Sequence, residues 1–145
     1  LVDTDAFNYG MLASDWSVES DLWESLTDDV TMNIVRKGES VLVYIKQRSK
    51  SHLKSYGFVT EFAGYKCLAV NSRYESSMIF DSVRNQYPVC VMFEFTGRCW
   101  KYSLYTNGRL NASQIASIYG GGGHAGAAGF TTDTLLPCFT KEISE

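Results

Sequence analysis

Four consecutive glycines at residues 120–123 constrain the fold of this chain more than any other feature. Glycine loses more backbone freedom on folding than any other residue, so a run of four is costly inside a folded region. The run lies between a segment with helical periodicity and a segment with strand character, not in a polar linker. Such a loop lets backbone N–H groups point outward together and lets a large oxyanion approach closely. The glycines therefore predict a tight helix-to-strand connection that can receive a phosphate.

The residues after the glycines fit the same interpretation. His124 comes next, at the start of an expected short helical turn, where an anion is further favoured. Small residues at 125–129 allow close packing on a sheet, and Phe130 anchors the exit. A flexible loop with a chance histidine is the alternative that the glycines alone leave open. A P-loop and a dinucleotide fingerprint are excluded, because no Gly-Lys-Ser/Thr follows and because the run comes after a helix.

The remaining pattern predicts an α/β fold: a mixed sheet of about five strands with flanking helices, preceded by N-terminal helices. Apolar spacing predicts helices within residues 5–36, closed by Lys37 and Gly38. Apolar runs at 41–45 and 67–71 predict buried strands. The expected helix between them, over residues 50–58, predicts that these two strands pair in parallel. A further connecting helix is expected at residues 74–86, before Pro88.

Strict alternation at residues 89–95 predicts a strand, followed by a turn at Thr96–Gly97 and a returning strand over 99–106. That turn places Phe93 opposite Trp100 and Val91 opposite Tyr102. The same register places Cys99 opposite Glu94, which argues against a bridge between Cys90 and Cys99. The alternation favours a core position for these aromatic side chains over a stacking platform, and it puts Tyr105 on the opposite face.

The last third of the chain predicts a short helix and a final strand. Asn111 and Gln114 have capping-box spacing for a helix over residues 111–119, with Ile115 and Ile118 as its buried stripe. A strand is expected at residues 127–132, and a short helix around Pro137. We divide the chain into an N-terminal helical segment, residues 1–36, and a domain at residues 37–145.

Cysteine usage and hydropathy favour a reducing compartment. The four cysteines lack C-x-x-C spacing, so neither a zinc site nor a thioredoxin-like motif is expected. No apolar run approaches the roughly 20 residues that span a membrane. We therefore expect a cytoplasmic protein with free, mostly buried thiols. The cysteines are Cys67, Cys90, Cys99 and Cys138.

Charge is unevenly distributed along the chain. Residues 1–40 carry nine acidic and two basic side chains, and residues 41–145 carry seven acidic and eleven basic ones. The basic bias of the second part favours attraction of phosphates, although acidic residues on solvated helices explain the first part equally well. The basic stretch at residues 46–54 is more typical of a solvated helix face than of a nucleic-acid rim.

The full string at residues 120–130, Gly-Gly-Gly-Gly-His-Ala-Gly-Ala-Ala-Gly-Phe, resembles the hallmark of the DHH-associated domain. This is the C-terminal half of the DHH-family phosphoesterases: RecJ-type exonucleases, oligoribonucleases, cyclic-dinucleotide phosphodiesterases and exopolyphosphatase-like relatives. The resemblance extends to Ser103-Leu104-Tyr105, to the helix at 111–118, to Lys37-Gly38-Glu39 and to Ala69-Val70-Asn71. It covers roughly residues 37–132.

The resemblance implies a domain that binds a phosphate or a terminal nucleotide of the substrate. By position, the implied binding residues are Gly121, Gly122, Gly123 and His124, followed by Ser103, Tyr105, Asn71 and Arg109. Tyr105 departs from the family, in which many members carry a phosphate-binding arginine there. A tyrosine brings no charge but could stack on a base or ribose. Arg73, Arg98 and Arg109 are the candidates to compensate for the lost charge.

The family's metal-binding half is not recognisable in this sequence. There is no Asp-His-His motif, and the only histidines are His52 and His124. Two-metal hydrolysis needs several carboxylates and imidazoles, so no cofactor and no catalytic residue is expected in this chain. We expect a fragment of a longer manganese-dependent enzyme, whose DHH domain holds two Mn²⁺ ions. The expected partners are that domain and a short oligonucleotide, a single-stranded end or a cyclic dinucleotide; no membrane is expected, and a homodimer is left open.

Two other functions stay open. A non-catalytic nucleotide- or nucleic-acid-binding regulatory module would explain both the absent metal motifs and Tyr105. The related accessory domain of alanyl-tRNA synthetases binds tRNA, but it carries a longer glycine cluster without the ending seen at residues 124–130.

Overall fold

The computed structural model describes residues 3–73 and 76–140. The chain divides into two compact units, Leu1–Arg48 and Ser49–Glu145. Helix α2, Asp28–Tyr56, contributes to both, so the predicted boundary after residue 36 lies within this helix. In the described ranges, no helix is both long enough and apolar enough to cross a membrane.

The first unit consists of α1, Thr4–Leu12, packed on the first part of α2. Two glycines lie where the helices touch. A Cβ on Gly10 would collide with the carbonyl of Ile34, and a Cβ on Gly38 would collide with the carbonyl of Ala6. The prediction that Gly38 ends a helix is therefore wrong: this glycine lies inside α2 because only a residue without a side chain permits so close an approach.

The predicted strand at residues 41–45 is also wrong, because these residues belong to α2. Their burial has a helical period: Ile34 and Leu42 are buried, whereas Val43 and Tyr44 are exposed. A run of five apolar residues does not by itself distinguish a buried strand from a helix segment. The predicted end of the helix near Gly57 is confirmed, since α2 closes at Tyr56.

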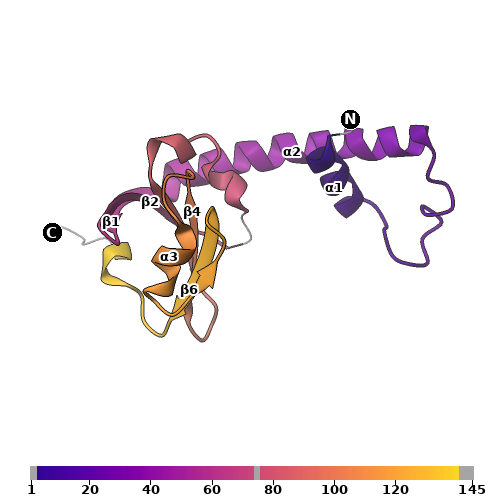
Figure 1. The fold of residues 1–145 in the computed structure, drawn as a ribbon. Helices are drawn as coiled ribbons and strands as arrows, with labels where there is room; N and C mark the ends of the chain where they lie inside the picture. Colours follow the sequence, from indigo (N-terminus) through magenta and orange to yellow (C-terminus); the bar gives the residue numbers. More distant parts are fainter. Residues whose placement is uncertain (1–2, 74–75, 141–145) are drawn as a thin grey trace. The chain divides into compact units, whose positions relative to one another are not determined.

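The second unit is built on a six-stranded mixed sheet in the order β1-β2-β3-β4-β6-β5, and Figure 1 shows how its strands and α3 are arranged. An α/β fold with a mixed sheet was predicted, and it is confirmed. Its elements are β1 Phe58–Phe62, β2 Tyr65–Asn71, η1 Ser77–Phe80, η2 Arg84–Gln86, β3 Val89–Phe95, β4 Trp100–Thr106, α3 Ala112–Ser117, β5 Gly122–Gly123, β6 Ala127–Thr132 and η3 Pro137–Phe139.

One parallel pair interrupts the antiparallel sheet. It joins β2 to β3, not residues 41–45 to 67–71 as predicted. The crossover contains the short 3₁₀ helices η1 and η2 instead of one helix over residues 74–86, of which residues 74–75 lie outside the described part. Strand β1 was not predicted; it forms an antiparallel hairpin with β2.

The β3–β4 hairpin is confirmed, but its predicted register is wrong by two residues. Phe93 lies opposite Tyr102, and Phe95 lies opposite Trp100. The reason is a longer turn: the Thr96 N–H donates to the carbonyl of Cys99 at 2.9 Å, so all four residues 96–99 lie outside the ladder. Cys90 and Cys99 are not partners, as predicted, and all four cysteines are free.

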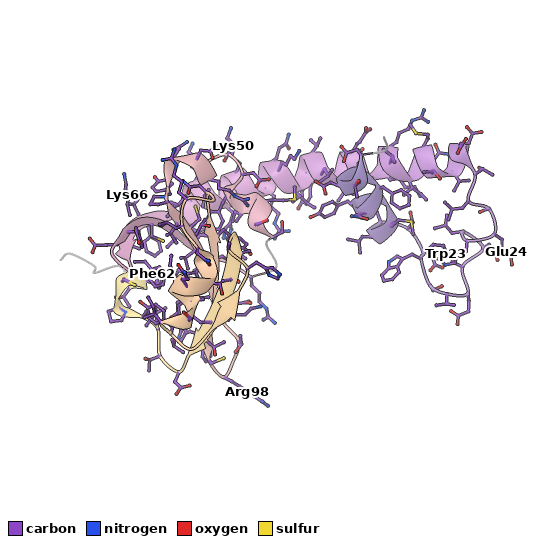
Figure 2. The ribbon with its side chains drawn as sticks, viewed as in Figure 1. Trp23, Glu24, Lys50, Phe62, Lys66 and Arg98 are labelled. Carbon is purple, nitrogen blue, oxygen red and sulfur yellow. The ribbon has the colours of Figure 1, made fainter. Side chains whose placement is uncertain are left out.

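Both faces of the central strands are buried. The face covered by α3 and η3 is aromatic: Phe93, Tyr102 and Phe130 are buried there together with Val91 and Leu104. The other face of β2 and β3 packs on α2, η1 and neighbouring residues through Leu53, Phe80, Cys90 and Met92. Phe62, labelled in Figure 2, belongs to the aromatic layer.

The C-terminal elements largely follow the prediction. Asn111 caps α3 by accepting from the N–H groups of Ser113 and Gln114, β6 covers residues 127–132, and η3 begins at Pro137. Ile115 is buried as predicted, but Ile118 is 72% exposed, so that part of the expected stripe is wrong. Helix α3 ends at Ser117, and Ile118 follows as its C-cap residue.

Candidate functional site

Strand β4 carries different side chains on its two faces. Tyr102 and Leu104 are buried in the aromatic layer. Lys101, Ser103 and Tyr105 alternate with them and therefore lie on the opposite face, because successive strand residues point to opposite sides. Lys101 is exposed, whereas Ser103 and Tyr105 are partly buried. This alternation places a cation and two hydroxyl groups in one row.

Beside this row, the sheet has almost no side chains. Gly129 on β6 lies opposite Ser103, and Gly122 on β5 lies opposite Gly129. A Cβ on Gly129 would lie 2.8 Å from the carbonyl oxygen of Tyr102, so the backbone there leaves no room for one. A cavity of about 480 Å³, which we call the glycine cavity, opens beside Gly129. Its lining includes Lys101, Ser103, Tyr105, Gly120, Gly121 and Gly129.

A second cavity, of about 440 Å³, lies on the other side of the same row. It shares Lys101, Ser103 and Tyr105 with the glycine cavity. Its remaining lining comes from the end of β2 and from β3, and we call it the charged cavity. These additional residues are Ser72, Arg73, Met92 and Glu94.

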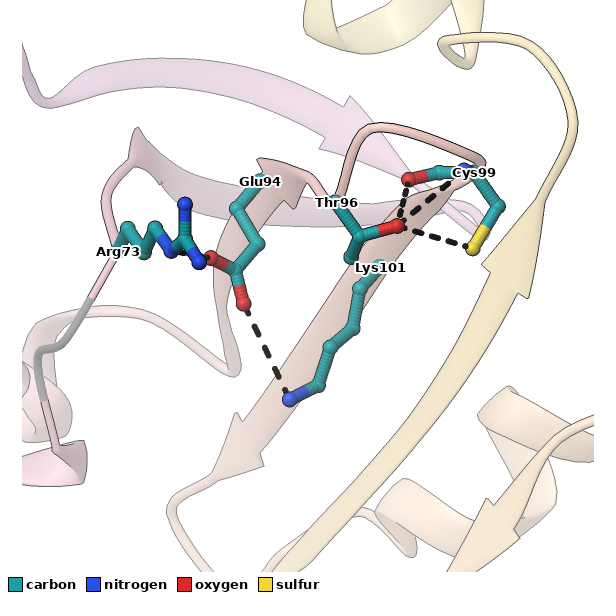
Figure 3. Close-up of polar contacts among 5 residues, drawn as sticks. All are labelled: Arg73, Glu94, Thr96, Cys99 and Lys101. Carbon is teal, nitrogen blue, oxygen red and sulfur yellow. Dashed lines mark hydrogen bonds and ion pairs between the residues drawn. The ribbon is translucent and has the colours of Figure 1, made fainter.

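Glu94 lies between the two cations of the charged cavity (Figure 3). Its carboxylate is 3.7 Å from Nε of Arg73 and 3.9 Å from Nζ of Lys101. Lys101 is its direct cross-strand partner. Thr96 and Cys99, also drawn in Figure 3, make the hairpin turn: the Thr96 hydroxyl donates to the carbonyl of Cys99 at 2.9 Å.

Tyr105 packs against the crossover segment. Its ring is 5.8 Å from that of Phe80. Burial raises the pKa of the phenol, and a side-chain hydrogen bond with Ser103 and the positive charge of Arg84 oppose that rise only in part. The hydroxyl therefore stays protonated at neutral pH and keeps a hydrogen-bond donor for an anion. Nε of Arg84 is buried without a hydrogen-bond partner among the described residues.

The glycine run closes α3 and begins an edge strand. The N–H of Gly121 donates to Ala116 and the N–H of Gly120 donates to Ser117, with Gly120 at φ +78°. This is a Schellman motif. These two amides are therefore occupied by the helix end, and the expectation that the loop amides point outward together does not hold for them.

His124 lies in the turn between β5 and β6, not at the start of a helical turn as predicted. Its N–H donates to the carbonyl of Ala127 at 2.7 Å, and its side chain is exposed. Because Gly122 and Gly123 pair with β6, the run continues the sheet where a helical turn was expected. Of the described residues, Gly122, Gly123 and His124 are not among those that line the two cavities, although Gly120 and Gly121 are.

Of the other binding residues that the resemblance implies, some line the cavities and some do not. Ser103 and Tyr105 line both cavities. Asn71 ends β2 and is exposed, with its carbonyl 3.3 Å from Nε2 of His52. Arg109 lies in the exposed turn after β4. Neither Asn71 nor Arg109 is among the residues that line the cavities in the described part of the chain.

Of the arginines considered as substitutes for a charge at position 105, Arg73 lines the charged cavity. Arg98 lies at the tip of the β3–β4 turn and points away from the sheet in Figure 2. Sequence reasoning missed Lys101, Glu94 and Arg84. For Lys101 a signal was present, because it lies two residues before Ser103 on the same strand face. Glu94 and Arg84 could not be found without the strand register and the crossover path.

No three His, Cys, Asp or Glu side chains within residues 3–73 and 76–140 gather closely enough to hold a metal ion. The row that both cavities share offers one cation, Lys101, and the hydroxyl groups of Ser103 and Tyr105; the charged cavity adds Arg73 and Glu94. Ammonium and hydroxyl groups of this kind can donate hydrogen bonds to an anion.

Comparison with families and with curated proteins found no matching family model and no matching curated protein. Solved structures do match. A pGpG-specific phosphodiesterase, PggH from Vibrio cholerae, aligns with a TM-score of 0.53 at 15% identity, over 78% of this chain and 42% of that one. This shows a shared fold, which agrees with the resemblance to the DHH-associated domain.

Two further structures align less closely. An exopolyphosphatase-related protein from Bacteroides fragilis has a TM-score of 0.49 at 16% identity, over 79% of this chain and 36% of that one. A DHH domain from a protein described as belonging to a family of ribosomal proteins has a TM-score of 0.44 at 13% identity, over 75% and 35%. The chain thus spans less than half the length of each of these proteins.

Proposed function

We propose that residues 49–145 form a DHH-associated domain that binds a phosphate group of a nucleotide or of a single-stranded nucleic-acid end. The observation that carries the proposal is the row Lys101, Ser103 and Tyr105, which lines one cavity together with Gly120, Gly121 and Gly129. Phosphate oxygens accept hydrogen bonds, and this row supplies an ammonium group and two hydroxyls on one strand face.

The glycine surface contributes access more than hydrogen bonds. Without side chains at Gly120, Gly121 and Gly129, which line the glycine cavity, a phosphate or a sugar can lie close to the backbone. Tyr105 offers a neutral hydroxyl and an aromatic face on which a base can stack. The resemblance implies a further contact of the ligand with His124, which lies in the exposed turn between β5 and β6.

We propose that the parent protein is a cytoplasmic phosphodiesterase whose metal-bearing domain performs the hydrolysis. The fold shared with a pGpG-specific phosphodiesterase supports the general class, a phosphate-containing substrate. In this account the present chain positions the substrate and takes no part in bond cleavage. A regulatory module without hydrolysis is the second candidate, which Tyr105 favours because a tyrosine adds no charge to neutralise phosphate.

The test is the affinity of the chain for AMP, measured by isothermal titration calorimetry at low salt. Lys101→Ala and His124→Ala are each expected to weaken binding about tenfold, a typical loss for one contact to an anion. Arg98→Ala is the matched control, because it also removes one positive charge but lies at the hairpin tip. Equal losses in Lys101→Ala and Arg98→Ala would mean that only net charge matters, and the proposal would fail.

A second assay distinguishes a phosphodiesterase from a non-catalytic regulatory module. Manganese-dependent hydrolysis of short RNA and cyclic dinucleotides by a protein that joins this chain to a DHH domain supports the enzyme. If the nucleotide binds but is not hydrolysed, the result supports the non-catalytic module.

A further inference from the structure

Arg84, the first residue of η2, has one side-chain nitrogen that is buried but unused. Its Nη2 donates to the carbonyl of Ser77 at 3.4 Å and lies 3.5 Å from a carboxylate oxygen of Asp81. Its Nε is buried and has no hydrogen-bond partner among the described residues. Buried donors are almost always paired in folded proteins, so an unpaired one needs an explanation.

The crossover that carries Arg84 packs on Tyr105. The ring of Phe80 lies 5.8 Å from that of Tyr105. Val83, the residue before Arg84, and Tyr105 both pack against the same buried cluster, to which Phe80 and Cys90 belong. Cys90 is also the direct cross-strand partner of Tyr105. Arg84 therefore lies over the face of the sheet that carries Tyr105 and Cys90.

The charge of Arg84 acts on these same two side chains. Burial raises the pKa of the Tyr105 phenol and of the Cys90 thiol, and the guanidinium group of Arg84 opposes both rises. A guanidinium group keeps its charge throughout the pH range of interest. The carboxylate that pairs with it, Asp81, is 57% exposed, and such pairs are weak. Tyr105 thus lies in the field of a positive charge.

Tyr105 connects this charge with the cavities. It lines both of them, whereas Arg84 is not among their lining residues in the described part of the chain. The protonated phenol can donate a hydrogen bond to a phosphate oxygen. Sharing that proton leaves negative charge on the phenol oxygen, which a nearby cation stabilises most where water is excluded. A cation behind Tyr105 therefore strengthens this hydrogen bond without touching the ligand.

We propose that Arg84 is a positioning residue of the phosphate site, whose guanidinium group strengthens the hydrogen bond that Tyr105 donates to the ligand. The proposal rests on the proposed function, because it takes the phosphate to lie beside Tyr105. It adds to Lys101 a positive charge that comes from the crossover and not from the strands of the site. The unpaired Nε is then what burial of the guanidinium group beside Tyr105 costs.

A purely structural role for Arg84 leads to different expectations. If Arg84 only tied η2 to Ser77 and Asp81, replacing it with lysine or with a neutral residue would affect AMP binding alike, and the effect would persist without the Tyr105 hydroxyl. If its charge acts through Tyr105, lysine retains the affinity, and removal of the hydroxyl abolishes the effect of the charge.

The experiment measures the affinity of the full chain for AMP by calorimetry at low salt. Arg84→Gln removes the charge and keeps an amide donor, and it is expected to weaken AMP binding about threefold to tenfold, whereas Arg84→Lys weakens it by no more than about twofold. In a Tyr105→Phe background, Arg84→Gln is expected to change the affinity by no more than about twofold. Arg98→Gln, at the hairpin tip, is the matched charge control, and circular dichroism confirms that each variant is folded.

Asp81→Asn keeps the proposal testable if Arg84→Gln does not fold. It removes the carboxylate that pairs with Arg84, so it is expected to tighten AMP binding about twofold to threefold. Glu61→Gln, which removes an exposed carboxylate from β1, is the matched control and is expected to leave the affinity unchanged.

Three results overturn the role of Arg84 while leaving the proposed function intact, provided that the unaltered chain binds AMP. They are an unchanged affinity in folded Arg84→Gln, an equal loss in Arg84→Lys, and an undiminished loss in the Tyr105→Phe background. No tightening in Asp81→Asn relative to Glu61→Gln overturns it as well. Failure of the unaltered chain to bind AMP overturns the proposed function itself.

Discussion

The two faces of the sheet at β4 and β6 carry different kinds of side chain. On one face, Tyr102 stacks on Phe130 at 4.6 Å, and its hydroxyl accepts from the N–H of Leu136 at 2.9 Å. On the other face, the neighbouring positions are Lys101, Ser103 and Gly129, which border two open cavities. The same two strands therefore supply a packed aromatic layer and an accessible polar surface.

Adjacent residues of β4 therefore differ in what they can contribute: one set packs in the core, and the other is accessible to a ligand. Along most of the central strands β2 and β3 both faces are buried, although the end of β3 borders the charged cavity. On the corresponding face of β4, Tyr105 packs on Phe80, whereas Ser103 and Lys101 border the cavities. If the account is right, substitutions on the aromatic face change the free energy of unfolding, and substitutions on the polar face change ligand affinity.

The largest expected effect is that of Tyr102→Ala. It removes a fully buried ring, its stacking with Phe130 and its hydrogen bond to Leu136, so we expect a loss of about 3–5 kcal/mol in the free energy of unfolding. Urea denaturation measures it. Ser103→Ala, one residue along the strand, is expected to change the same quantity by about 0.5 kcal/mol or less. Similar losses in both variants would remove the distinction between the faces.

Next in size is a pair of alanine substitutions in the glycine run. A Cβ on Gly121 would lie 2.8 Å from Cα of Phe130 and would also crowd the carbonyl of Gly129, whereas a Cβ on Gly122 meets nothing within 4 Å. Gly121→Ala is expected to destabilise the protein by about 2 kcal/mol, and Gly122→Ala by less than about 1 kcal/mol. Thermal unfolding compares the two, and equal values would show that the run is not packed on β6.

The buried cysteines of the central strands predict that the free energy of unfolding depends on pH. Burial raises the pKa of Cys90 to about 11, a rise that the nearby charge of Arg84 opposes, and it raises the pKa of Cys67 further. Above about pH 9 the unfolded chain releases thiol protons that the folded chain retains. The free energy of unfolding should therefore fall as the pH rises from about 9 to 11, by about 1–3 kcal/mol.

Urea denaturation across that pH range checks this prediction, and Cys90→Ala should flatten the profile relative to Cys99→Ala, a partly exposed residue at the hairpin turn. A profile that is unchanged in Cys90→Ala would show that Cys90 is accessible to solvent in the folded chain.

The smallest expected effect is that of Lys101→Ala on stability. Its ion pair with Glu94 is long and partly exposed, so the free energy of unfolding should change by about 0.5 kcal/mol or less. Chemical denaturation at low and high salt measures it. A loss above about 2 kcal/mol would mean that Lys101 is structural, and its effect on AMP affinity would no longer report on the site.

Local signals in the sequence were sufficient for the C-terminal elements. Alternation over residues 89–95, the Asn111 cap and Pro137 each act within a few residues, and the structure confirms β3, the start of α3 and η3. The predicted position of Tyr105, on the face opposite Tyr102, is confirmed for the same reason.

Signals that depend on distant contacts were misinterpreted. In the sequence, Gly38 resembles a glycine that ends a helix. In the structure it lies inside α2, where α1 approaches so closely that no side chain fits. The β3–β4 register depended on whether two or four residues form the turn, which sequence alone did not decide. The charged cavity joins residues of β2, β3 and β4, so Glu94 could not be connected with Arg73 before the strands were paired.

The central claim, that phosphate binds on the polar face of β4 and β6, is tested most directly by NMR titration of the ¹⁵N-labelled chain with AMP. The account predicts that the largest amide shift changes occur at Lys101, Ser103, Tyr105, Gly120 and Gly121, and that Leu136 and Phe139 on the aromatic side change little. Largest changes at Leu136 and Phe139, or no change on β4 at millimolar AMP, would contradict it.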